Sequence, residues 1–350
     1  MASGPPAFGS EIVTSTKPLR IVFMGTPALA AHILERLADA CGTAAGAGSA
    51  NTGFEIAGVV TRPDQPRGRG LRLEPSEVAV VAAQRGLSVL KPEKIRTAEF
   101  LAELSALNPD LLVVAAYGRI LPDPVLAAAR IMPINVHASL LPRHRGASPV
   151  EGAILAGDIE SGVTIMRVTS KMDAGPMLLA CATPIAPRET QGTLKEKLAE
   201  LGAAALLEVL EKLRHGPLVE TPQDESCATY TSPVSKADAV IDWNADATQI
   251  ERMVRAYDPW PVARTRLGED ELLVWRATLD DSAAPGATET PAAAGVSVAP
   301  GIVVRTKPDV AVQCGRGRIV LAEVQAAGRK RMGAAEFLRG RRVIPGARLG

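Results

Sequence analysis

The sequence predicts an α/β domain built on a mainly parallel sheet, followed by a small β-domain that folds as a barrel. Three observations lead to this. Short apolar runs alternate with helical segments up to residue 216, the stretch 217–235 is polar and contains prolines, and from residue 236 onward the apolar segments are short and separated by turns. The length of 350 residues is also typical of about two domains, with 217–235 as the linker between them.

Each element of the first domain follows from its local pattern. Leu19–Met24 is a short apolar run that ends at a glycine, and Leu111–Ala116 is apolar throughout, as in a strand buried on both faces. The remaining runs of this kind predict strands at Ile56–Val60, Leu87–Leu90, Ile134–Val136 and Gly162–Val168. Between them we predict helices at Ala28–Leu37, Glu77–Arg85, Thr97–Leu107, Pro149–Ala156 and Leu194–Leu213, and a loop at Thr61–Leu73.

The second domain, residues 236–350, is predicted from five short segments: Ala239–Trp243, Glu271–Ala277, Gly301–Val304, Val310–Cys314 and Arg318–Val324. Residues 1–18 are rich in Gly, Pro and Ser and contain no apolar core, so we expect a disordered leader and no secretory signal. The segments 39–53 and 282–299 consist mainly of small residues, which predicts two flexible insertions.

Composition excludes several classes of protein. Hydrophobic residues make up 47% of the chain, enough for a sizeable core, and the net charge of +1 excludes a strong overall attraction to nucleic acid or anionic membranes. There is no apolar run of about 18 residues that would span a bilayer. The four cysteines form no CxxC pair, which disfavours a zinc site or disulfides. We therefore expect a soluble, reduced, cytoplasmic protein without a metal.

The C-terminal end differs in charge from the rest. Residues 301–350 contain eleven Lys or Arg and three Asp or Glu, a net charge of about +8. A basic end on an otherwise neutral chain is expected of a protein with a phosphate-rich partner, although charge alone fits a solvated surface equally well.

Gly25-Thr26-Pro27 follows the first strand, where a dinucleotide-binding domain would carry GxGxxG. Only one of these glycines is present, and Pro27 lacks the N–H that a pyrophosphate would use. A dinucleotide site is therefore disfavoured.

Asn135 and His137 end a predicted strand, and alternation puts both side chains on the same side of the sheet. Ligands of open α/β sheets bind beyond the carboxyl ends of the strands. There an amide N–H can donate to a developing oxyanion, and an imidazole can move a proton near neutral pH. A single histidine at a strand end is, on its own, more often structural.

Two later segments bear on this site. The loop Arg143-His144-Arg145-Gly146 contains arginines that could meet an anion. Asp173 begins a turn after the strand Gly162–Val168, so its carboxylate can approach His137 and orient the imidazole. The alternative is an aspartate that only initiates a turn.

Asn135-Val136-His137-Ala138-Ser139-Leu140-Leu141-Pro142, with Asp173 downstream, resembles the folate-dependent formyltransferases. Further motifs resemble the branch of that family that acts on methionyl initiator tRNA, over nearly the whole chain from about residue 19. They are Met24-Gly25-Thr26-Pro27, Thr61-Arg62-Pro63-Asp64, Gly68-Arg69-Gly70, Ala116-Tyr117-Gly118, Asp242-Trp243 and Asp258-Pro259-Trp260-Pro261.

The resemblance implies a Rossmann-like formyltransferase domain at 19–216 and an OB-like tRNA-binding domain at 236–350. It also implies a cytoplasmic monomer that uses 10-formyltetrahydrofolate as co-substrate and formylates methionyl initiator tRNA for translation initiation. The positions that match the family motifs are the catalytic residues Asn135, His137 and Asp173, and the folate-binding residues Ser139, Leu140, Leu141, Pro142 and Tyr117. The tRNA-binding residues are expected to be Arg62, Arg67, Arg69, Arg72, Arg329, Lys330 and Arg331.

Some alternatives stay open at the level of sequence. His137 can act as the direct base or as a cationic donor. The amine can belong to an amino sugar or a glycinamide nucleotide, water can replace the amine, and a non-catalytic RNA-binding protein is a further class. His144 stands where the family usually has Trp, and the two insertions are longer than the family pattern.

Overall fold

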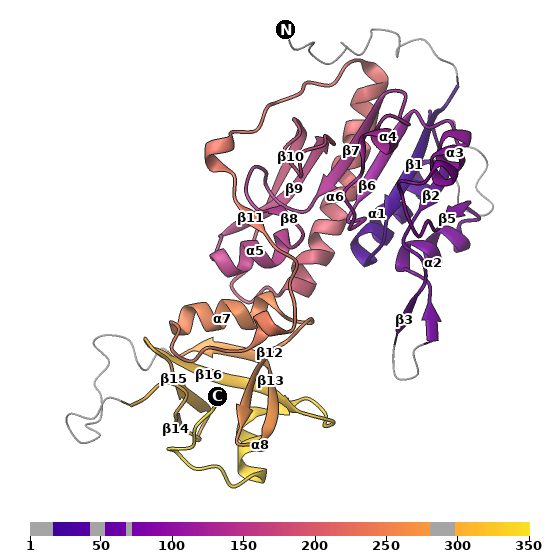
Figure 1. Cartoon of the computed structure of the whole chain (residues 1–350). Helices are drawn as coiled ribbons and strands as arrows, with labels where there is room; N and C mark the ends of the chain where they lie inside the picture. Colours follow the sequence, from indigo (N-terminus) through magenta and orange to yellow (C-terminus); the bar gives the residue numbers. More distant parts are fainter. Residues whose placement is uncertain (1–16, 43–52, 68–71, 281–297) are drawn as a thin grey trace. The chain divides into compact units, whose positions relative to one another are not determined.

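The structure, a computed structural model, describes residues 17–42, 53–67, 72–280 and 298–350. The predicted leader up to residue 16, most of both predicted insertions and Gly68-Arg69-Gly70 lie outside these ranges. The chain forms two compact units (Figure 1). The N-terminal unit runs to Pro149 and includes Glu160–Pro184 and Lys195–Thr231, and the C-terminal unit comprises Val150–Ile159, Ile185–Leu194 and Ser232–Gly350.

A seven-stranded sheet forms the centre of the N-terminal unit, in the order β10-β9-β7-β6-β1-β2-β5. The five strands from β5 to β7 run parallel, whereas β9 is antiparallel to both β7 and β10. The prediction of a mainly parallel sheet is thus confirmed. The strands are β1 (Leu19–Gly25), β2 (Phe54–Val60), β5 (Val89–Leu90), β6 (Leu111–Ala115), β7 (Met132–His137), β9 (Glu160–Arg167) and β10 (Met177–Pro184).

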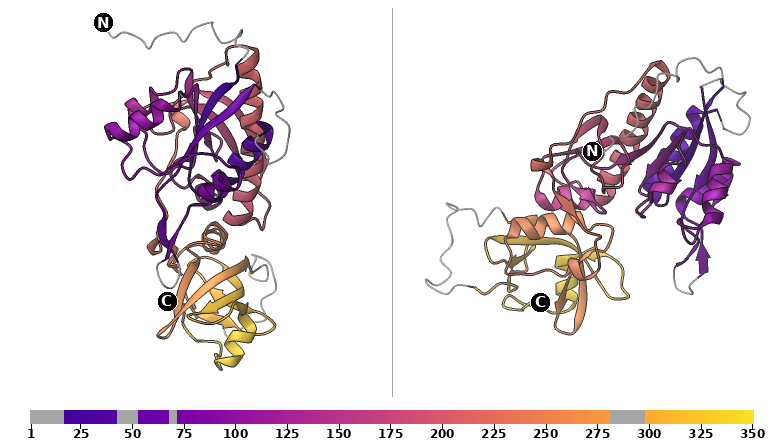
Figure 2. Two further views of the ribbon diagram at one scale, coloured as in Figure 1. Left: turned by 90° about the vertical axis from the view of Figure 1, so that its right-hand side faces the viewer. Right: turned by 45° about the horizontal axis from the view of Figure 1, so that its top comes forward.

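Helices cover both faces of this sheet (Figures 1 and 2). On one face Val22, Met24 and Val114 belong to a core cluster with Phe100 of α3 and Val125 of α4. On the other face, Gly202 of α6 packs against Val136 of β7 and Ile33 of α1, and the lack of a side chain permits this close approach. The helices are α1 (Ala28–Ala40), α2 (Glu77–Gln84), α3 (Ala98–Ala106), α4 (Asp123–Leu126) and α6 (Gln191–His215).

Two short pairings modify the predicted loops. The predicted loop Thr61–Leu73 contains a hairpin of β3 (Gln65–Arg67) and β4 (Arg72–Glu74), which projects away from the sheet (Figures 1 and 2). In addition, β8 (Arg145–Gly146) pairs in parallel with β11 (Tyr230–Thr231), so part of the predicted linker adds to the N-terminal unit.

The C-terminal unit is built on an antiparallel sheet in the order β12-β13-β16-β15-β14, with β17 added to β16. Its last residues bridge the two edge strands, because Leu349 pairs with Leu267 of β12 and Arg348 pairs with Ile302 just before β14. This closure agrees with the predicted barrel. The strands are β12 (Ala263–Leu267), β13 (Asp270–Leu279), β14 (Val303–Arg305), β15 (Val310–Gln313), β16 (Arg318–Ala326) and β17 (Met332–Gly333).

The described helices of this unit include α5 (Pro149–Ala156, from its second residue), α7 (Ala247–Ala256) and α8 (Ala334–Gly340). The predicted strand Ala239–Trp243 is wrong: a 3-10 turn over 237–239 ends at its first residue, and within the segment only Val240 forms a bridge, to Arg264. Helix α7 was not predicted, although Asp246 and Gln249 form a capping box that marks its start.

Among the described residues, no helix is long and apolar enough to cross a membrane.

Ser76 connects two elements of the N-terminal unit. Its hydroxyl caps α2 by accepting a hydrogen bond from the amide of Ala79 at 3.1 Å, and it lies 2.7 Å from the hydroxyl of the fully buried Thr61. We expect Ser76→Ala to lower the free energy of unfolding by about 1–2 kcal/mol, because it removes the cap and leaves Thr61 without this partner. Urea denaturation measures the change. Ser105→Ala, on the exposed side of α3, is the matched control and is expected to stay within about 0.5 kcal/mol.

Candidate active site

Strand β7 brings Asn135 and His137 to the carboxyl end of the parallel part of the sheet. Asn135 pairs in register with Val114 of β6 and with Met166 of β9, and His137 pairs with Thr164. Because Val136 faces α6, alternation turns both polar side chains toward the opposite face. Asn135 is half-buried, whereas His137 is only 6% exposed.

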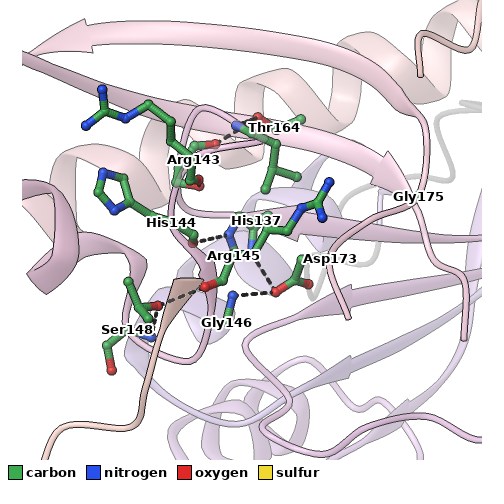
Figure 3. Close-up of polar contacts among 12 residues, drawn as sticks. His137, Arg143, His144, Arg145, Gly146, Ser148, Thr164, Asp173 and Gly175 are labelled. Carbon is green, nitrogen blue, oxygen red and sulfur yellow. Dashed lines mark hydrogen bonds and ion pairs between the residues drawn. The ribbon is translucent and has the colours of Figure 1, made fainter. Parts of the chain in front are cut away.

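His137 lies between two oxygen acceptors (Figure 3). Its Nε2 is 3.0 Å from the carbonyl oxygen of His144, which can only accept, so Nε2 carries the hydrogen. Its Nδ1 is 3.8 Å from Oδ2 of Asp173, which is an ion-pair distance and longer than a hydrogen bond. Nε2 thus donates to the carbonyl oxygen, and Nδ1 faces the carboxylate at ion-pair distance without a hydrogen bond. The residues predicted at 137 and 173 are therefore brought together.

The position of Asp173 is set by its backbone. Its φ of +48° is in the left-handed region, which aspartate tolerates better than most residues. Its Oδ2 accepts a hydrogen bond of 2.8 Å from the amide of Gly146. Two residues later, Gly175 lies against the carbonyl oxygen of Arg167, where a Cβ would come within 1.9 Å. This turn thus requires glycine at 175 and directs the carboxylate toward His137.

The predicted folate-contacting segment is fixed to the sheet by a buried threonine. Thr164 of β9 donates to the carbonyl oxygen of Ser139 at 2.8 Å and accepts from the amide of Leu141 at 3.0 Å. Ser139 is fully buried, and its hydroxyl donates to the carbonyl oxygen of Arg143 at 2.7 Å. Leu140 and Pro142 are half-buried, whereas Ser139 and Leu141 are buried, so Leu140 and Pro142 are the members of this segment with side chains open to a ligand.

Known proteins share both the sequence and the fold of this chain. The family model described as "Formyl transferase" matches residues 19–210, and the model "Formyl transferase, C-terminal domain" matches residues 233–342. The methionyl-tRNA formyltransferase of Nitrosospira multiformis is 42% identical over 93% of this chain and 97% of its own length. That of Aromatoleum aromaticum is 44% identical over 95% of this chain and 97% of its own.

The chain belongs to the methionyl-tRNA formyltransferase family. Solved structures with lower identity share the fold. An N-formyltransferase from Helicobacter canadensis, in complex with folinic acid and dTDP-3-aminofucose, is 15% identical and covers 87% of this chain and 98% of its own, with a TM-score of 0.60. HypX from Aquifex aeolicus in complex with tetrahydrofolic acid is 19% identical and covers 91% of this chain and 47% of its own, with a TM-score of 0.56.

Tyr117, which the formyltransferase motifs associate with folate, lies in the core. It is 1% exposed and packs in the cluster that contains Val22, Met24 and Leu121. Its hydroxyl is buried and has no hydrogen-bond partner among the described residues, and burial raises the pKa of this phenol. Any contact of its ring with a ligand therefore requires a rearrangement of the core.

The basic residues expected to bind tRNA form two groups, one in each unit. Arg62 donates to the carbonyl oxygen of Gly118, the backbones of Arg67 and Arg72 are paired in the β3–β4 hairpin, and Arg69 lies outside the described residues.

In the C-terminal unit, Arg329 and Lys330 are exposed in the turn between β16 and β17. Arg331 follows them. It pairs with Glu323, and its guanidinium carbon lies 4.7 Å from the centre of the Trp275 ring.

In the part of the chain that the structure describes, no cluster of three or more His, Cys, Asp or Glu could hold a metal ion.

Sequence reasoning missed the partners of Arg145. This side chain, expected to be available to an anion, is 1% exposed and makes a double hydrogen bond to Glu225, with both distances 2.9 Å. It also donates to Oε1 of Gln223 and to the Tyr230 hydroxyl. All three partners come from the predicted linker. The polar run Gln-Asp-Glu at 223–225 is the only sequence feature that could have indicated a partner for a buried arginine. Arg145 thus anchors the linker to the loop after His137.

This ion pair makes stability depend on pH. The Arg145 guanidinium, by donating to the carboxylate, holds the pKa of Glu225 below its ordinary value. A carboxyl group whose pKa falls on folding stabilises the protein above its unfolded pKa, and this contribution is lost as the pH falls through the folded value. We therefore expect the stability advantage of the wild type over Glu225→Gln to shrink as the pH is lowered through about 4. Thermal unfolding of both proteins at pH 7 and under acid conditions measures it, and an unchanged difference would contradict the assignment.

Proposed function

We propose that this chain transfers the formyl group of 10-formyltetrahydrofolate to the α-amino group of methionyl initiator tRNA, giving the formylmethionyl-tRNA with which translation begins. The observation that supports this most directly is the pairing of His137 with Asp173 at the carboxyl end of β7, in a chain similar to methionyl-tRNA formyltransferases over nearly its whole length. The folate is a donor substrate, and Leu140 and Pro142 offer it an apolar edge next to His137.

The reaction is an acyl transfer between two nitrogens. The amine attacks the formyl carbon, the bond from that carbon to the folate nitrogen breaks, and one proton passes from the amine to the folate nitrogen. Asn135 donates from its side-chain amide to the developing oxyanion. His137 moves the proton, and Asp173 holds the imidazole in place and stabilises its cationic form.

The tRNA is held, in this proposal, by residues outside this centre. Residues 19–216 act as the formyltransferase domain, 217–235 join it to residues 236–350, and the latter bind the tRNA backbone. Arginines on the hairpin and the basic turn after β16 supply the charge: Arg62, Arg67, Arg69, Arg72, Arg329, Lys330 and Arg331. Since His137, Asp173 and their partners all come from one unit of a single chain, a monomer suffices for the reaction, and we propose that it acts in the cytoplasm.

A direct assay tests the proposal. The protein is incubated with 10-formyltetrahydrofolate and either methionyl initiator tRNA or free methionine, and formyl transfer is followed. We expect transfer to the tRNA, with a rate at low tRNA concentration that falls steeply as salt is raised, because phosphate contacts release counterions. Comparable transfer to free methionine would favour a small-amine substrate, and donor consumption without any acceptor product would favour hydrolysis.

Asn135→Ala tests the oxyanion role. Loss of one such donor typically slows the chemical step by about 10²–10³-fold, so kcat should fall in this range while the affinity for tRNA stays near that of the wild type. Steady-state kinetics and a filter-binding measurement separate the two quantities. A large loss of tRNA binding with normal kcat would assign Asn135 to substrate binding instead.

A further inference from the structure

The side chain of Gln223 joins the two chain segments that contact His137. Its Nε2 donates to the main-chain oxygens of Asp173, at 2.8 Å, and of Gly175, at 2.7 Å. Its Oε1 accepts from Nε of Arg145 at 3.0 Å and from Nη2 at 2.8 Å. Both ends of the amide are thus engaged, one on the turn that carries Asp173 and the other on the loop that follows His137.

The Arg145 end of this link is immobilised. The guanidinium is 1% exposed, is bonded to both carboxylate oxygens of Glu225, and belongs to a residue whose backbone pairs with Tyr230. Its chain neighbours make the contacts to the site, because the carbonyl oxygen of His144 faces Nε2 of His137 and the amide of Gly146 donates to Asp173. The side-chain oxygen of Gln223 is therefore bound to a guanidinium that is itself held in place.

The turn that carries Asp173 depends on contacts that hold it in place. A left-handed backbone at a residue other than glycine is less favourable than the usual conformations, so the turn relaxes unless its surroundings hold it. Gln223 binds two carbonyl oxygens of this turn with one NH₂ group. A shift of about 1 Å in a group next to the reacting atoms can slow an enzyme by about 100-fold.

We propose that Gln223 is a positioning residue for formyl transfer: through the carbonyl oxygens of Asp173 and Gly175 it fixes the Asp173 carboxylate beside His137. This inference rests on the proposed function. It gives a residue of the predicted linker a part in the chemical step through the turn that carries Asp173.

Two substitutions separate positioning from general support. Gln223→Met keeps the length of the side chain and removes all four hydrogen bonds. Gln223→Glu keeps an acceptor for Arg145 but has no N–H for the two carbonyl oxygens. We expect both variants to lower kcat by about 10- to 100-fold, with KM for tRNA and for the folate within about twofold of the wild type. The carboxylate of Gln223→Glu faces the two carbonyl oxygens without a hydrogen to donate, so this variant should unfold at a lower temperature than the wild type, and kcat is compared at a temperature at which all variants are folded.

The C-terminal unit contains a matched control. Nε2 of Gln313 donates to the carbonyl oxygens of Cys314 and Gly317, at 2.9 and 3.1 Å, and its Oε1 accepts from Nε of Arg318 at 3.1 Å. Gln313→Met removes the same kinds of hydrogen bond far along the chain from Asp173. It should leave kcat within about twofold of the wild type, even if the loss of these hydrogen bonds lowers the unfolding temperature.

A double-mutant cycle with Asp173→Asn decides whether Gln223 acts through the carboxylate. Asparagine tolerates the same backbone, so the turn persists while the charge is lost. We expect Gln223→Glu to slow the Asp173→Asn enzyme by less than about twofold, because there is no carboxylate left to position. Equal losses in both backgrounds, or full kcat in Gln223→Glu, would overturn the inference. A wild type without formyl transfer would instead refute the proposed function.

Discussion

The contact between the imidazole of His137 and the carboxylate of Asp173 is the interaction on which the rest of this site depends. The two residues come from different strands and their following loops, and the 3.8 Å between their side chains exists only because several backbone features coincide. Strand β7 ends at His137, a left-handed residue turns the chain at 173, and the amide of Gly146 binds the carboxylate. Together these features hold the imidazole and the carboxylate next to each other at the carboxyl end of β7.

The surrounding structure is organised to hold this pair in place. The loop after His137 is fixed from one side by Thr164, whose hydroxyl bonds to the main chain on both sides of Leu140, and from the other by Arg145 and its partners. Arg145 and Glu225 are 80 residues apart in the chain. A polar stretch that seemed only to connect two domains thus supports the loop that carries the carbonyl oxygen facing His137.

The sequence allowed much of this to be predicted because local pattern decided it. The apolar run Leu111–Ala116 indicated a strand buried on both faces, and alternation put Asn135 and His137 on one side of the sheet. The pairing of Arg145 with Glu225 and Gln223 could not be predicted, since it depends on contacts between distant segments. The edge strand β10 escaped prediction because its sequence, MLLACATP, is apolar over its first six residues and shows no apolar–polar alternation, although none of these residues is fully buried. The strand expected at 239–243 is absent because Ile241 and Trp243 are buried in the core of the C-terminal unit, while the backbone there forms only the single bridge of Val240.

A double-mutant cycle on the central pair tests most directly whether the imidazole and the carboxylate act as one unit. The quantity measured is kcat for formyl transfer in His137→Gln, Asp173→Asn and the combined variant. If the two groups act together, the combined variant is no more than about twofold slower than His137→Gln, because the carboxylate acts through the imidazole that this variant has lost. If the two losses multiply, the carboxylate acts independently of the imidazole, which would contradict the role assigned to the pair.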